Sequence, residues 1–139
     1  MSIFLNITNP DNNYIKVEIP IAWKPGINEN GWGIDQDTIY SAINQKLQDT
    51  DNNIPIVTHN DNIKKGVIID IKHIVGYIQS FNPENKILIC SIKKGEYNIP
   101  LDNLEMTFNS IGNIGEDRML KDMYIIAGVP LLKGASCYK

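Results

Sequence analysis

Arginine is nearly absent from this sequence, and Arg118 is the single example. The sequence has 13 Lys and Arg residues and 16 Asp and Glu residues, which gives a net charge of -3 and a pI of about 5.3. The lysines are scattered, and no basic run carries interleaved aromatic residues. Because nucleic-acid binders usually present a basic face, we expect no nucleic-acid partner.

Cysteines and long apolar runs are also scarce. Cys90 falls in an apolar strand pattern and Cys137 in the tail, so their spacing indicates neither a metal site nor a disulfide framework. Residues 1–6 lack the basic region and long apolar core of a signal peptide, and no apolar run approaches membrane-spanning length. No glycine-rich phosphate loop is present. We therefore expect a soluble cytosolic protein with no membrane partner, metal or cofactor.

The hydrophobic content of 42% over 139 residues predicts one domain spanning residues 1–139. Alternating apolar residues predict strands separated by turns: residues 3–7, 14–19, 54–57, 66–81, 87–92, 104–109 and 119–129. The turns fall at residues 9–13, 82–86 and 115–117. A change of parity near Lys72 and His73 predicts a bulge or bend inside the 66–81 run.

One helix is predicted between these strands. Asp35 or Asp37 can cap its start, and residues 49–53 form a polar end. Its apolar residues recur at helical spacing: Ile39, Ala42, Ile43 and Leu47. The fold class is therefore α+β and mainly β, a small closed or strongly curved antiparallel barrel with this helix packed on it.

Two hydroxyls and one histidine suggest chemistry. Thr107 and Ser110 lie on a predicted strand that breaks at Gly112, and His59 follows the 54–57 strand in an exposed-looking segment. A serine-type hydrolase needs a histidine base and a hydroxyl nucleophile that meet in space and not along the chain. The simpler interpretation, a turn histidine and surface hydroxyls, fits the same residues.

The order and spacing of motifs from Asn28 to the C-terminus resemble the prohead core proteases of tailed bacteriophages, whose fold is related to the herpesvirus assemblins. Residues 106–112 are similar to the Val-Ser-Ser-Arg-Gly-Leu-Gly stretch that holds the family's nucleophile. Residues 55–61 resemble the segment with its catalytic histidine. The remaining likenesses are to the early loop and helix, the barrel strands and the closing strand with its Gly-Pro-Ser end: residues 28–43, 75–89, 121–129 and 134–136.

This resemblance implies a serine-type endopeptidase that cleaves scaffold and capsid precursor proteins inside the assembling prohead, in the host cytoplasm. His59 would take a proton from Thr107 or, failing that, from Ser110. Backbone N–H groups of the oxyanion site would stabilise the tetrahedral intermediate: those of Asn109, Ile111 and Gly112. The precursors would be its partners, and the chain could also form a homo-oligomer.

The chain departs from the family pattern where the chemistry would occur. Where the nucleophile motif has Ser, Ser, Arg and Gly, this chain has Thr107, Phe108, Asn109 and Ser110. The acid that would orient His59 falls on Pro130. These departures leave a second interpretation, a catalytically silent protease-fold protein of the head core or virion that binds partners through barrel edges or loops. A third is a small phage-encoded binding protein unrelated to assembly.

Overall fold

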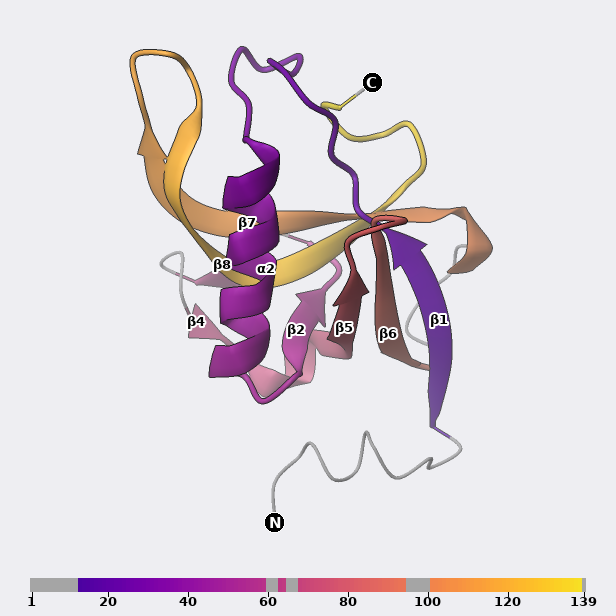
Figure 1. Ribbon diagram of the computed structural model, residues 1–139. Helices are drawn as coiled ribbons and strands as arrows, with labels where there is room; N and C mark the ends of the chain where they lie inside the picture. Colours follow the sequence, from indigo (N-terminus) through magenta and orange to yellow (C-terminus); the bar gives the residue numbers. More distant parts are fainter. Residues whose placement is uncertain (1–12, 60–62, 65–67, 95–100, 139) are drawn as a thin grey trace.

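The computed structural model describes residues 13–59, 63–64, 68–94 and 101–138 (Figure 1). Within these residues the chain is mainly β, with one α-helix, α2 (Gln36–Asp49). The strands are β1 (Tyr14–Pro20), β2 (Ile54–Val57), β3 (Ile63–Lys64), β4 (Ile68–Ile69), β5 (Ile74–Asn82), β6 (Ile87–Lys93), β7 (Leu104–Ile114) and β8 (Leu120–Leu132). None of the helices in these ranges is long and apolar enough to span a lipid bilayer.

Six strands form one mixed sheet in the order β1-β6-β5-β2-β8-β7, and β3 pairs with β4 apart from it. The expected closed antiparallel barrel is not what the structure contains. The sheet is open, and β2 runs parallel to β8 through the pair Ile56 and Gly128, because the long connection between them allows a crossover. Its two edges touch at a single bridge, where Ala22 N donates to Met106 O at 2.8 Å just after β1. A strongly curved sheet is compatible with this arrangement.

Helix α2 packs against β8 and β5 and lies across the sheet (Figure 1). Its predicted apolar residues are all buried in the main core: Ile39, Ala42, Ile43 and Leu47. Asp35 is the N-cap by position, although its side chain makes no capping hydrogen bond. Packing of the apolar stripe therefore stabilises this helix more than its cap does.

The second face of the sheet carries a smaller cluster. Val57, Ala127 and Val129 pack there with Ile63 of β3, and the half-buried Ile69 of β4 rests against them. The main core on the other face includes Ile78 and Ile125, whereas Ile89 is only half-buried. Both faces of the sheet are thus covered over part of their area.

Two predicted strands have different bounds in the structure. The expected bend in the 66–81 run is a 3₁₀ turn at Ile71–His73, which separates β4 from β5. Its start is fixed by Asp70, whose carboxylate accepts from Lys72 N at 3.2 Å. The predicted break at Gly112 is wrong, because β7 continues to Ile114 and pairs with Leu120. The predicted strand 3–7 and most of the turn after it lie outside the described residues.

Candidate functional site

Thr107 lies in the middle of β7, opposite Val129 of β8. Its hydroxyl donates a hydrogen bond to the Val129 carbonyl oxygen at 2.7 Å. A hydroxyl carries one proton, so in this structure that proton points to the sheet backbone and not to an imidazole. The predicted nucleophile is therefore held as part of the β7–β8 ladder.

His59 is exposed, as predicted, and follows the end of β2 after a bend at Thr58. Val57 at that end packs in the same cluster as Val129, and Thr107 shares the face of Val129 because directly paired residues point the same way. However, β8 lies between β2 and β7, so the two outer backbones are about 10 Å apart. The structure places His59 just beyond the end of β2, and one strand, β8, separates β2 from the strand that carries Thr107.

Ser110 and the predicted oxyanion groups lie where the β7–β8 pairing is irregular. The register shifts between Asn109 and Ser110, and again between Ile111 and Asn113. In both shifts the extra residue belongs to β8, because β7 advances by one or two residues while β8 advances by two or three. Asn109 and Ile111 thus sit in an extended strand, not in the tight turn that groups backbone N–H donors around an oxyanion.

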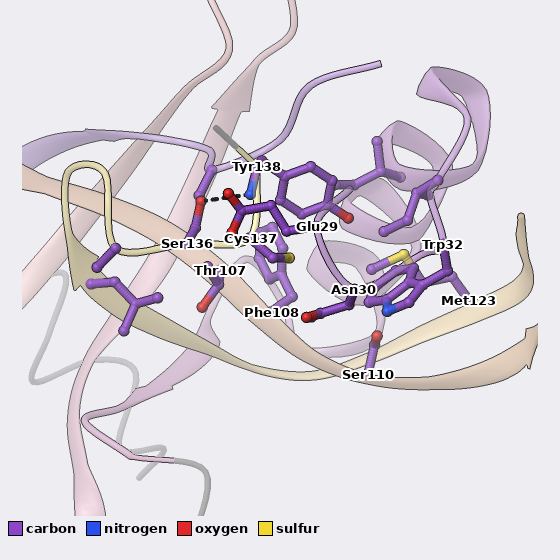
Figure 2. Close-up of a pocket in the computed structure, with 15 residues that line it drawn as sticks. Glu29, Asn30, Trp32, Thr107, Phe108, Ser110, Met123, Ser136, Cys137 and Tyr138 are labelled. Carbon is purple, nitrogen blue, oxygen red and sulfur yellow. Dashed lines mark hydrogen bonds between the residues drawn. The ribbon is translucent and has the colours of Figure 1, made fainter. Parts of the chain in front are cut away.

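A cavity of about 500 Å³ adjoins this part of β7. Thr107 and Ser110 both border it, and His59 is not among its lining residues. Figure 2 shows the Ser110 hydroxyl pointing away from its strand, to the side on which Asn30 and Trp32 lie. The structure therefore places both predicted nucleophile residues at the border of one cavity, whereas His59 is not among its lining residues.

The loop before α2 forms one wall of this cavity. Its first tryptophan, Trp23, is buried and donates from Nε1 to Ile34 O at 2.9 Å, which anchors the loop to the core. The second, Trp32, is only half-buried and faces the cavity. Trp23 thus anchors one end of the loop, and Trp32 near the other end offers an aromatic surface to a ligand.

The C-terminal segment forms a second part of the cavity wall, next to this loop. Cys137 O accepts from Glu29 N at 3.1 Å, and the Tyr138 ring meets the Trp32 ring edge-on with centroids 6.5 Å apart. Tyr138 N donates to the Ser136 hydroxyl at 3.2 Å (Figure 2). These contacts join the end of the chain to the loop of residues 24–34, so the cavity is formed by three segments far apart in sequence.

Glu29 is the one Asp, Glu, Lys or Arg residue among the lining residues that the structure describes. Burial raises the pKa of the neighbouring Cys137 thiol, and the Glu29 carboxylate raises it further. Burial also raises the pKa of Tyr138. Both groups are therefore protonated at neutral pH, and Cys137 is not an activated nucleophile.

Sequence reasoning missed three of these residues: Glu29, Cys137 and Tyr138. No local pattern marks them, because each reaches the cavity through contacts between the loop and the tail. The likeness of residues 28–33 to a family loop was the one signal that pointed to this region. Over the residues that the structure describes, no group of three or more His, Cys, Asp or Glu side chains could hold a metal ion.

Comparisons with protein-family models, with curated proteins and with solved structures find no match.

Proposed function

We propose that this chain is a phage head-assembly protein that binds a segment of a capsid or scaffold precursor in the β7 cavity and does not cleave it. The observation that carries this proposal is the 2.7 Å hydrogen bond from the Thr107 hydroxyl to Val129 O. Catalysis would require this proton to pass to His59, which lies outside the cavity. The phage context rests on the motif resemblance described above.

The cavity has the chemistry of a site that binds and does not react. Its aromatic wall consists of Trp32, Phe108 and Tyr138, and polar groups of Glu29 and Asn30 stand at its side. Ligand sites typically combine an apolar lining with a few polar groups that set orientation. Phe108 stands where the family has its second serine, so an aromatic contact replaces a hydroxyl at that position.

A second candidate is the active maturation protease, and one observation favours it. Thr107 shares a face of the sheet with Val57, two residues before His59, so a shift of the β2 end could bring the imidazole toward the hydroxyl. His59 would then act as the base and Thr107, or failing that Ser110, as the nucleophile. Under either candidate the proposed location is the assembling prohead in the host cytoplasm.

The test mixes the purified chain with the capsid and scaffold precursors of the same phage, and measures capture by pull-down and cleavage by intact mass. We expect capture without cleavage. Ala135→Trp places a large ring at the cavity and should weaken capture by about tenfold, equivalent to roughly 1.4 kcal/mol. Ser41→Trp adds the same ring on the exposed side of α2, away from this cavity, and should leave capture unchanged.

Two further variants separate binding from catalysis. His59→Ala and Thr107→Ala should both capture the precursors as the unmodified chain does, because neither change fills the cavity. If the unmodified chain cleaves a precursor and each alanine variant abolishes that cleavage, the protease is the correct function. Loss of capture in Ser41→Trp as well as in Ala135→Trp would show that the cavity is not the binding site.

A further inference from the structure

The two edges of the six-stranded sheet are protected very differently. The edge strand β1 carries Lys16, Glu18 and Pro20. At the other edge, β7 has one charged residue, Glu105, near its start, and no proline. Charges and prolines on edge strands keep the unpaired backbone groups from pairing with another chain. The β7 edge lacks this protection over the whole of its second half.

That second half, Ser110–Ile114, is uncharged and well formed. It is extended throughout, and both irregularities in its pairing insert the extra residue into β8, with Asp122 of β8 at a φ of 54°. Bulges usually blunt an edge by distorting the edge strand itself. Here the distortion falls on the inner strand, and the outer one stays regular.

Apolar side chains stand exposed along this stretch. Ile111 is 49% exposed and Ile114 is 53% exposed. Ile21, just after β1, pairs with Met106 at the start of β7, and Gly33 of the loop before α2 pairs with Met119, which lies after the end of β7. Neither of these bridges involves Ser110–Ile114. In Figure 1 the β7–β8 hairpin projects beyond the rest of the sheet, at the upper left. An exposed, regular, uncharged edge with isoleucines is a surface that another strand can join.

We propose that Ser110–Ile114 pairs antiparallel with the same stretch of a second copy, about a two-fold axis near Gly112. When the same stretch of two copies pairs about a two-fold axis, a charged residue in one copy lies near the identical charged residue of the other, and the two repel. The absence of charge in Ser110–Ile114 fits this demand. The two sheets then join into one of twelve strands, because each copy contributes six.

The pairing itself does not depend on the proposed function, because it needs only the outer edge of β7, and Ser110 is the one residue of the stretch that also borders the cavity. The cavity lies against the region of Thr107–Ser110, and the pairing stretch extends from there toward the hairpin tip. The two-fold axis places the two cavities on one continuous sheet. A dimer could therefore hold two segments of a repeated partner at a fixed spacing.

The test measures molar mass by light scattering and sedimentation at protein concentrations from about 1 μM to about 1 mM, a range that covers weak and moderate association. We expect a monomer that converts to a dimer within this range. In the dimer, residue 111 of one copy lies diagonally across the axis from residue 111 of the other, with Cα atoms roughly 7–8 Å apart. Ile111→Lys therefore brings two positive charges close together and should weaken dimerisation by at least about tenfold. Ile15→Lys makes the same change on β1, where Ile15 is 38% exposed, and should have no effect.

Hydrogen exchange locates the contact. The amide hydrogens of Ser110–Ile114 should exchange more slowly as the concentration rises, while those of β1 should not change. Far-ultraviolet circular dichroism checks that Ile111→Lys is folded, and Asn113→Lys serves as a second variant on the same exposed stretch. The proposal is overturned if the chain stays monomeric throughout, or if neither lysine variant weakens the dimer. Protection of this edge only when a precursor protein is added would show that the partner is a different chain.

Discussion

Cys90 lies in the middle of β6 and is fully buried in the main core. Burial raises the pKa of its thiol from an ordinary value of 9.0 to about 12. The unfolded chain ionises at the lower value, so between pH 9 and about 12 it releases a proton that the folded chain keeps. Stability from this group is complete below pH 9 and is lost as the pH rises toward 12.

We expect Cys90 to contribute a loss of up to about 1.4 kcal/mol of unfolding free energy per pH unit in that window. Urea unfolding at several values from about pH 8 to about pH 10.5 measures this slope. Tyr77 and Tyr138 also have pKa values raised by burial, so Cys90→Ala is the comparison that isolates the thiol. Identical slopes in the two proteins would mean that Cys90 is ionised or exposed in solution.

Ile43 shows how much one inward side chain of α2 contributes. It is fully buried, and Ile43→Asp would place a carboxylate in the core without a partner. We expect the unfolding free energy to fall by at least about 4 kcal/mol, in the range of severe core mutations. Asn44→Asp introduces the same carboxylate on the exposed side of the helix and should change stability by less than about 0.5 kcal/mol. Denaturant unfolding measures both, and similar losses would contradict the assigned inward face.

The sequence was informative about single residues where burial decides their role. The inward side of α2 and the exposure of His59 were both predictable, because each follows from the pattern of apolar and polar residues around it. The partner of the Thr107 hydroxyl was not predictable. It depends on which carbonyl of β8 lies opposite, and that register is set by pairing across the sheet and not by neighbours in sequence.

At the scale of elements, Gly76 shows why β5 and β6 pair as closely as they do. A Cβ atom added at this position would collide with the Ser91 carbonyl oxygen of β6. Because the obstacle is backbone, it cannot rotate away, and the strands must separate. We expect Gly76→Ala to cost roughly 1–3 kcal/mol, the usual penalty for overpacking.

The control for this change is Ser80→Ala, at an exposed position of the same strand, where the cost should stay within about 0.5 kcal/mol. Thermal unfolding by circular dichroism compares the two variants. A Gly76→Ala protein as stable as the unmodified one would show that the two strands are farther apart at this point than the structure has them.

Elements could be predicted where composition changes sharply along the chain. The turn after β5 and the hairpin turn after β7 were located by their Asn, Pro, Gly and Asp residues, since these favour turn conformations. The break between β4 and β5 was predicted only as a bend, because alternation of apolar residues continues through Ile71 while the backbone forms a 3₁₀ turn. The extension of β7 past Gly112 was missed, since a glycine in a strand pattern normally signals an interruption.

At the scale of the whole molecule, the tail and the loop before α2 depend on one another. Tyr138 contacts Trp32 edge-on, and such aromatic pairs contribute about 0.5–1.5 kcal/mol beyond the area they bury. Tyr138→Ala should therefore lower stability by at least about 1 kcal/mol and alter the fluorescence of Trp32. Tyr14→Ala, at a half-buried position in β1, is the matched control and should leave the tryptophan spectrum unchanged.

The fold class could be predicted from the sequence, but the topology could not. Strand-rich composition with one amphipathic helix is a property of segments, whereas the order β1-β6-β5-β2-β8-β7 is a property of contacts between them. The parallel pairing of β2 with β8 could not be predicted, because it depends on which strands lie side by side and not on the residues within either strand. The cavity could not be predicted for the same reason, since a loop, an edge strand and the tail form it together.

The pairing of Ile56 with Gly128 also sets when the protein can fold during synthesis. β8 lies between β2 and β7 in the sheet, yet it is the last of these six strands to be synthesised. A nascent chain that ends before Leu120 can pair β1, β6, β5 and β2 but has no strand to join them to β7. The sheet is therefore completed only once β8 has been synthesised, and until then the apolar residues of α2 and β2 that pack against β8 are available to chaperones.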